Sequence, residues 1–311
     1  MIEINHLSKR YGARVAVDDL TVTVRPGRVT GFLGPNGAGK STTMRAIIGL
    51  DRPTAGEVLV NGRRYVDLPA PLREVGALLD AKAMHPGRTA YHHLLALAAT
   101  AGIGRARVLE VLELVGLADV ARHRTRTFSL GMGQRLGIAA ALLGDPGVIL
   151  LDEPVNGLDP DGIHWIRGFL RARAAEGGTV FVSSHLMSEM AMTADHLVIL
   201  GRGRLLADVP TAEMVAATSP SVRVRSPQAA ELEVVLRAEG VRFDRPQPEL
   251  LVILDRGADE IAELAFAHQV VLHELTATHG SLEDAYLELT RNELEYSTTP
   301  TANPTDLRRV A

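Results

Sequence analysis

The apolar positions in the first eighty residues fall into short runs that are typical of β-strands. Strands are predicted at residues 2–4, 20–24, 29–34 and 73–79. The first two surround a turn at Gly12, and the third has the continuous apolar character of a buried strand. The segment 40–50 has the pattern of a helix, and Asn61-Gly62 is a hairpin signal.

From Thr89 to Leu143 the pattern changes to helical spacing. The apolar residues expected on one helix face are Val108, Leu109, Val111, Leu112, Val115 and Leu117. Strands then alternate with helices, with strands predicted at 147–152, 179–184 and 196–201 and helices at 161–176 and 186–193. Alternation of this kind predicts an α/β fold with a helical insertion.

The composition changes near Thr218-Ser219-Pro220, where a second domain is expected to begin. Beyond it, strands are predicted at 222–225, 241–244, 250–254 and 270–275, and helices at 228–239 and 258–268. This βαββαβ order predicts a small ferredoxin-like domain. A last helix is expected at 281–295, and the polar, proline-containing residues 297–311 are expected to be disordered.

Composition excludes several kinds of site. The chain of 311 residues has no cysteine, which excludes disulfides, thiol catalysis and cysteine–zinc sites. A net charge of −4 argues against a non-specific nucleic-acid surface, so no nucleic-acid partner is expected. No stretch has the roughly 18 uninterrupted apolar residues of a spanning helix. The N-terminal residues lack the apolar core of a signal peptide, so a cytoplasmic location is expected.

The segment GPNGAGKS, residues 34–41, fits the phosphate-binding pattern G-x-x-x-x-G-K-[ST] between a strand and a helix. Its glycines let the backbone point N–H groups at phosphate oxygens, and the helix N-terminus favours negative charge. Lys40 is expected to reach the β- and γ-phosphates, and Ser41 to bind Mg²⁺. The alternative is a glycine-rich turn with a surface lysine.

A second chemical motif is VILLDEP, residues 148–154. Four apolar residues predict a buried parallel strand that ends in two acids. Asp152 is expected to bind Mg²⁺, and Glu153 to act as general base toward the attacking water. The alternative is an ordinary strand that ends in solvated acids.

Together these motifs resemble an ABC ATPase, the nucleotide-binding subunit of ATP-binding-cassette systems, over about residues 1–210. Tyr11 occupies the place where this family stacks adenine, and His185 that of the histidine that contacts the γ-phosphate. The resemblance implies ATP as ligand and assigns its cradle to Gly34, Pro35, Asn36, Gly37, Ala38, Gly39, Lys40, Ser41 and Thr42. The family's dimer-contact loop, the D-loop, matches Asn156, Gly157, Leu158 and Asp159.

The implied fold is a RecA-like core with a helical subdomain at about 84–145. The nucleotide-binding domain would then span 1–218 and the small C-terminal domain 219–296.

The family's Leu-Ser-Gly-Gly-Gln signature appears as FSLGM, residues 128–132. Ser129 and Gly131 are kept, while Leu130 replaces a glycine and Met132 the glutamine. The resemblance implies that Ser129, Gly131 and Met132 complete the ATP site of a second cassette, so that a dimer, expected to be a homodimer, holds two ATP molecules. The alternative is a plain serine N-cap on an amphipathic helix.

Asp80 stands where the family usually has a glutamine that touches Mg²⁺ and faces the membrane subunit. It is a candidate Mg²⁺ ligand, or else a solvated loop aspartate. Asp80, the signature form and the segment 281–290 resemble the ABC-2-type export ATPases, which include bacitracin-, lantibiotic- and multidrug-type exporters. The histidines His85, His92 and His93 are expected to be solvated or interface residues without a metal.

The predicted function is therefore that of an ATP-hydrolysing subunit of an ABC-2-type exporter. Its implied partner is an integral membrane permease, which would place it on the inner face of the cell membrane. The alternative is a single-cassette ABC ATPase outside transport, for example of a cell-division or regulatory type. A simple nucleotide kinase is disfavoured by the signature and switch motifs.

Overall fold

The computed structural model describes residues 1–81, 83–216, 221–278 and 281–290. A six-stranded sheet in the order β5-β6-β7-β3-β8-β9 lies at the centre of the nucleotide-binding part. Its strands are β3 (Arg28–Leu33), β5 (Val75–Leu78), β6 (Val148–Leu151), β7 (Thr179–Ser183), β8 (His196–Gly201) and β9 (Arg204–Pro210). The pairs β5–β6, β6–β7 and β7–β3 are parallel, so their carboxyl ends meet at one edge.

A three-stranded antiparallel sheet, β2-β1-β4, packs beside it. Its strands are β1 (Ile2–Tyr11), β2 (Arg14–Val24) and β4 (Ala55–Val60). The first two are longer than predicted, because both continue through register shifts up to the Gly12 turn. Asn61-Gly62 does form a turn, yet it closes only an isolated bridge between Val60 and Arg63. The predicted turn is therefore confirmed, but in the described residues no second strand pairs with β4 across it.

The core of this part forms where the two sheets meet α1 (Lys40–Ile47). Phe32 and Phe181, on neighbouring parallel strands, place their ring centroids 4.7 Å apart. Met44 of α1 is fully buried in the same cluster. All members of this cluster lie between Ile2 and Leu205, so the cluster needs no residue of the C-terminal part.

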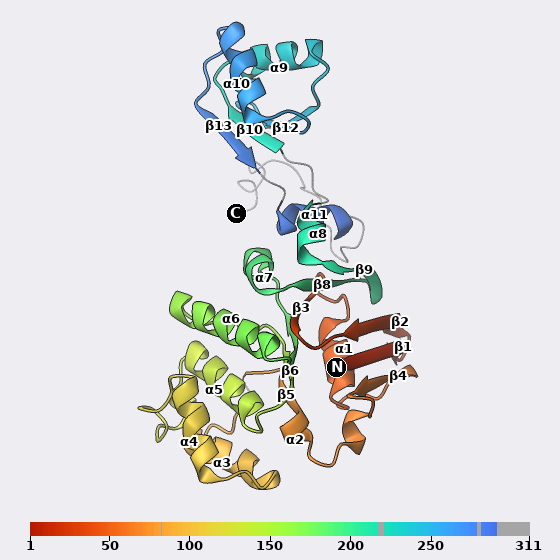
Figure 1. The fold of residues 1–311 in the computed structure, drawn as a ribbon, viewed down its shortest axis with the longest axis vertical. Coiled ribbons are helices and arrows are strands. Elements are labelled where there is room, and N and C mark those ends of the chain that lie inside the picture. The colour runs from red at the N-terminus through yellow and green to blue at the C-terminus, as the bar shows by residue number, and fades with distance from the viewer. Residues whose placement is uncertain (82, 217–220, 279–280, 291–311) are drawn as a thin grey trace, which may run out of the picture. The chain divides into compact units, whose positions relative to one another are not determined.

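The predicted helical insertion contains α3 (Ala90–Thr100), α4 (Arg105–Leu114) and α5 (Leu130–Leu142). These helices and the β1–β2–β4 sheet lie on opposite sides of the central strands (Figure 1). The predicted apolar face of the insertion is buried except at Leu109, whose exposed fraction is 56%. Leu109 lies between the buried Val108 and Val111 and points outward. The remaining helices of this region are α2 (Pro71–Glu74) and α6 (Pro160–Ala175).

Residues 186–197 and 209–289 form a separate compact unit. It includes α7 (Met187–Thr193), α8 (Thr211–Ala216) and α11 (Leu282–Thr290). Its sheet, in the order β11-β12-β10-β13, is antiparallel. The strands are β10 (Ser221–Arg225), β11 (Phe243–Gln247), β12 (Leu250–Ile253) and β13 (Glu274–Thr278), with helices α9 (Ala229–Ala238) and α10 (Ala258–Ala267). The ferredoxin-like order is confirmed.

Two strands of this unit begin later than predicted: β11 begins at Phe243 rather than at 241, and β13 begins at Glu274 rather than at 270. Val270 was expected to start a strand, but its N–H donates to the carbonyl of Ala265 at the end of α10. The chain turns at Gln269, which has a φ of 57°, and Val270 packs into the core. The predicted boundary at 218–220 and the tail 297–311 lie outside the described residues. No helix in the described ranges is both long and apolar enough to cross a membrane.

Candidate functional site

The glycine-rich loop lies between β3 and α1, as the sequence predicts. Two of its glycines are required by close backbone approach. A methyl group on Gly34 would lie 2.6 Å from the carbonyl oxygen of Leu200, and one on Gly39 would lie 2.5 Å from that of Ala16. Gly39 has a φ of 104° and caps α1 without a side-chain hydrogen bond. The first N–H groups of α1 therefore face outward from a helix start that favours anions.

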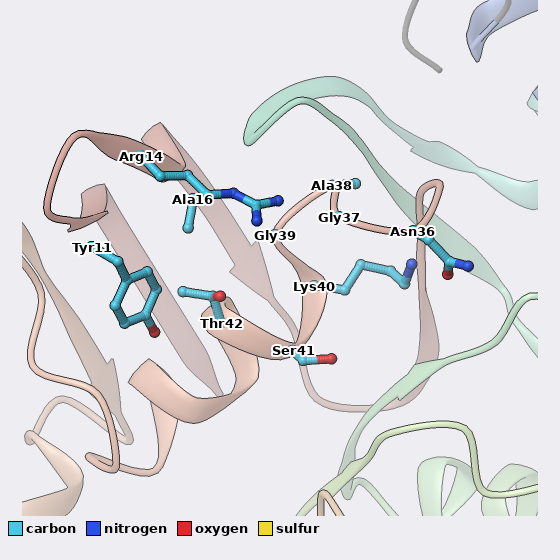
Figure 2. A pocket seen from close by; sticks show the side chains of 10 residues that line it. All are labelled: Tyr11, Arg14, Ala16, Asn36, Gly37, Ala38, Gly39, Lys40, Ser41 and Thr42. Atoms are coloured by element: carbon cyan, nitrogen blue, oxygen red, sulfur yellow. The ribbon is translucent and has the colours of Figure 1, made fainter. Parts of the chain in front are cut away.

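A cavity of about 430 Å³ lies against this loop. Figure 2 shows its lining, which consists of Tyr11, Arg14, Ala16, Asn36, Gly37, Ala38, Gly39, Lys40, Ser41 and Thr42. Among the residues predicted for the ATP cradle, Gly34 and Pro35 are outside this lining, and their carbonyl oxygens accept hydrogen bonds from Lys40 Nζ at 2.5 and 3.3 Å. Burial lowers the pKa of Lys40, against the opposing effect of Glu153 and Asp152.

Two residues of this lining, Arg14 and Ala16, were not predicted from the sequence. The Arg14 side chain extends from the start of β2 toward Ala38 and Gly39 (Figure 2). The guanidinium of Arg14 thus supplies a second positive charge to the cavity besides that of Lys40. Two cationic side chains make the cavity suitable for a polyanion. The available signal was a basic residue three positions after Tyr11, across the tight Gly12 turn.

Tyr11 lies at the far end of the cavity from Lys40 (Figure 2), with an exposed fraction of 46%. Its hydroxyl donates to Asp51 Oδ2 at 2.7 Å, and Arg45 Nε donates to the same oxygen at 2.7 Å. The hydrogen bond from Arg45 lowers the pKa of Asp51, and partial burial together with Asp51 raises the pKa of Tyr11. Lys9 Nζ lies 4.9 Å from the ring centroid. The ring is thus fixed at its hydroxyl, and its role toward adenine stays a prediction.

Asp152 follows β6 at the carboxyl edge of the sheet. Ser41 Oγ donates to its Oδ2 at 2.8 Å, and Ser183 Oγ, at the end of β7, donates to Oδ1. A hydroxyl and a carboxylate from two motifs therefore meet, and such hard oxygen donors suit Mg²⁺. Ser183 was not predicted, although a small polar residue at the end of a parallel strand was a usable signal.

Glu153 has a left-handed backbone, with a φ of 51°. Its carbonyl oxygen accepts a hydrogen bond at 3.1 Å from the buried Gln134 Nε2, and its N–H donates to Ser183 Oγ at 3.0 Å. His185 Nδ1 lies 2.7 Å from Glu153 Oε2. The predicted base and switch histidine are therefore hydrogen-bonded partners, and the polar backbone atoms of Glu153 are held on both sides.

Ser129 is the N-cap of α5 and accepts a hydrogen bond from the N–H of Met132 at 3.2 Å. Ser129 therefore does act as a helix N-cap. Its phosphate-binding role stays a prediction. Ser129, Gly131 and Met132 do not line the cavity at the glycine-rich loop.

The D-loop leads into α6. Asn156 and Leu158 close turns with Glu153 and Val155, and Asp159 caps α6 by accepting the Gly162 N–H at 3.0 Å.

Asp80 lines a second cavity, of about 540 Å³, that reaches Ser41 and Asp152 at one end. Its other lining residues are Arg45, Ile48, Leu50, Ala77, Leu78, Leu79, Ala81, Ala83, Met84, His93, Leu97, Gly137 and Ala140. His93 is buried, its Nδ1 has no hydrogen-bond partner, and burial lowers its pKa. Among the described residues no three His, Asp or Glu side chains are grouped to hold a metal. Asp80 as a Mg²⁺ ligand stays a prediction.

Two family models match the chain. The model described as "ABC transporter" matches residues 17–156, and a domain of unknown function matches residues 220–283.

One relative matches over nearly its whole length, and two others match over about two thirds of this chain. The chain is 35% identical over 300 residues to the uncharacterized ABC transporter ATP-binding protein YhcH of Bacillus subtilis, covering 93% of this chain and 96% of the relative. It is 41% identical to the bacitracin transport ATP-binding protein BcrA of Bacillus licheniformis, covering 68% and 70%. It is 35% identical to the lantibiotic transport ATP-binding protein SrtF of Streptococcus pyogenes, covering 66% and 89%.

Solved structures give the same result for the fold. One is the dimeric, post-hydrolysis ATP-binding cassette MJ0796 bound to ADP and Pi, with a TM-score of 0.62 and 26% identity, covering 68% of this chain and 99% of that one. Another is an ATP-binding subunit of an ABC transporter, with a TM-score of 0.63 and 28% identity, covering 85% and 99%. The chain therefore belongs to the ATP-binding proteins of ABC transporters, and the reaction that it catalyses is ATP hydrolysis.

Proposed function

We propose that this chain powers an ABC-2-type exporter, as a homodimer bound to a separate membrane permease on the inner face of the cell membrane. The observation that carries the catalytic part is a set of two hydrogen-bonded pairs, Ser41 with Asp152 and Glu153 with His185, of which Ser41 also lines the glycine-rich cavity. The names of BcrA and SrtF support the transport part, since both are called transport ATP-binding proteins. No relative reported above points to the cell-division or regulatory alternative.

We propose the following roles for the chain's own groups. The N–H groups of the glycine-rich loop, Lys40 and Arg14 bind the phosphates of ATP, and the ring of Tyr11 stacks on adenine. Ser41 and Asp152 would hold Mg²⁺, which would offset phosphate charge when bound. Asp80 is proposed as a further oxygen donor to the ion or its water.

Glu153 orients the attacking water and takes its proton at a carboxylate oxygen. The His185 imidazole fixes that carboxylate through Nδ1 and leaves Nε2 to face the γ-phosphate. Because Gln134 and Ser183 hold the backbone of Glu153, the carboxylate is positioned before the reaction begins.

The signature residues act in the second half of the dimer. Ser129, Gly131 and Met132 lie at the start of α5, away from the cavity of their own chain. We propose that Ser129 and the N-terminus of α5 bind the γ-phosphate of ATP held by the partner copy, and that Gly131 and Met132 help to complete that site. Asn156, Gly157, Leu158 and Asp159 contact the same copy. ATP would then favour the closed dimer by contacting both chains, which is the differential affinity that closure requires.

The cavity around Asp80 is the proposed contact with the permease. It joins the metal-binding side chains Ser41 and Asp152 to an apolar wall that includes Leu50 and Leu97. An amphipathic segment of the permease bound in this cavity would contact Ser41 and Asp152, so that a movement of these side chains would be transmitted to it directly.

The proposed domain boundaries are 1–218 for the cassette and 219–296 for the small domain. Each has its own buried cluster, one built between Ile2 and Leu205 and the other between Val222 and Leu275.

The test is a pull-down of the tagged full chain from detergent-solubilised native membranes, with partners identified by mass spectrometry. A polytopic membrane protein in stoichiometric amount is the expected result. A parallel pull-down with Leu97→Arg, which places a charge in the apolar wall of the second cavity, should lose that protein. Recovery of division or ribosomal proteins without a permease would contradict the export assignment and leave the ATPase assignment intact.

A further inference from the structure

The start of α5 is in close contact with the loop that carries Glu153. Leu130 has an exposed fraction of 56%, yet its side chain packs onto the backbone of Gly157. A methyl group built on Gly157 would lie 2.5 Å from Leu130 Cγ and 2.6 Å from Cδ2. In its present conformation this leucine leaves no room for a side chain at position 157.

Three further contacts join the same two segments. A methyl group built on Gly131 would lie 2.5 Å from the carbonyl oxygen of Gly157. Gln134 donates to the carbonyl of Glu153 at 3.1 Å, and Arg135 Nη2 lies 3.2 Å from Asp159 Oδ1. The loop from Glu153 to Asp159 is therefore contacted at its beginning, middle and end.

The four contacting positions form two rows on one helix face. Leu130 and Gln134 are four residues apart, as are Gly131 and Arg135, so each pair lies on adjacent turns of α5. Leu130 supplies the only large apolar side chain among them. The usual signature of the family has a glycine at this position, which offers no side-chain contact to the loop.

We propose that Leu130 is a positioning residue that holds the Glu153–Asp159 loop against the signature helix of the same chain. This inference rests on the proposed function, in which Ser129 serves the partner's ATP while Glu153 serves the chain's own ATP. When Ser129 binds the partner's ATP, the contact of Leu130 with the loop then fixes the position of the Glu153 carboxylate at the chain's own ATP. Leu130 thereby links the two sites of the dimer.

The first experiment measures steady-state ATP hydrolysis by the full-length wild type, Leu130→Gly and Leu130→Met. Leu130→Gly should lower kcat about tenfold, with KM changed by less than about twofold, since the loss is in positioning rather than binding. Its ATP dependence should also lose cooperativity. Leu130→Met keeps a long apolar side chain and should recover most of kcat. If Leu130→Gly keeps kcat and cooperativity, or if Leu130→Met fails to recover kcat, the proposal is wrong.

The second experiment tests the contact itself. Gly157→Ala should lower kcat because its methyl group meets Leu130. In the Leu130→Gly background the methyl group has room, so the two losses should not multiply. Gly62→Ala is the matched control, because Gly62 also has a φ of 76° but nothing within 4 Å of its built methyl group. If the losses at positions 130 and 157 multiply fully, the proposed coupling is absent.

Thermal unfolding of the same variants separates this inference from the proposed function. A wild type that binds no ATP and hydrolyses none would contradict the proposed function. Thermal unfolding alone would then test the contact between Leu130 and Gly157. Additive changes in stability from the substitutions at positions 130 and 157 would show that the proposed contact is absent. A wild type that hydrolyses ATP, combined with a fully active Leu130→Gly, would overturn only the inference.

Discussion

Glu153, the proposed general base, has an unfavourable backbone conformation. A non-glycine residue at a φ of 51° is held there by Gln134 on its carbonyl and by Ser183 on its N–H. Such conformations cost about 1–3 kcal/mol and persist where surrounding contacts impose them. Here they aim the carboxylate at His185, so the local strain is consistent with positioning of the base.

Glu153→Gln should stop ATP turnover without preventing ATP binding. Glutamine keeps the length and shape of the side chain but cannot take a proton from water, so the rate should fall by about 10²-fold or more. The bound ATP should then hold two chains together. Phosphate release and gel filtration with ATP measure the two effects. Turnover near that of the wild type would show that another group is the base.

Arg14→Ala should weaken ATP binding about tenfold, because the variant loses a charge-assisted contact to phosphate. Arg14→Lys should recover part of the affinity, since lysine restores the charge but not the planar guanidinium. Arg10→Ala is the matched control, as Arg10 does not line the cavity. Equilibrium titration with ATP decides the matter, and equal losses from Arg10 and Arg14 would indicate a general effect of charge.

At the scale of the element, the glycine-rich loop is defined by contact with backbone from elsewhere in the chain. Gly39→Ala should destabilise the protein by about 1–3 kcal/mol and abolish ATP binding, because its methyl group meets the carbonyl of Ala16. Gly177→Ala has a comparable φ of 93° but open space, and should cost less. Denaturant unfolding of both variants compares them. Equal losses would mean that the backbone angle alone, and not the contact, is responsible.

Periodicity predicted most elements and failed where long-range contacts set the boundaries. The strand and helix order of both parts follows from apolar spacing and from the punctuating glycines. The length of β1 was missed because its second half has exposed polar residues that pair with β2 across register shifts. Val270 was assigned to a strand because it is apolar, but it is buried where the chain turns at the end of α10. An apolar residue alone does not distinguish a strand from the end of a helix.

The site was predictable where a motif carries the chemistry along the chain. Lys40, Ser41, Asp152 and Glu153 could be named because phosphate and metal binding require those groups next to a strand. Arg14 and Ser183 each had a weak local signal, but they and Gln134 lie on separate segments that only the folded chain brings together at the site.

At the scale of the whole molecule, the two parts have separate cores, which predicts the outcome of a truncation. A chain that ends at residue 218 should remain folded and keep its ATP affinity, because both core sheets of the cassette and the glycine-rich loop are retained. Circular dichroism and ATP titration check this expectation, and ATP-dependent dimerisation then reports whether the small domain supports the dimer. An aggregated or unfolded product would contradict the proposed boundary.

We propose that each ATP site is completed by a second copy of the chain. Lys40→Ala removes the lysine of the chain's own cradle, and Ser129→Arg blocks the signature offered to the partner. Each variant alone should be inactive. Mixing the two should restore ATP hydrolysis, because the mixed dimer contains one site with an intact Lys40 and an intact Ser129. A mixture no more active than its components would contradict a site shared between two chains.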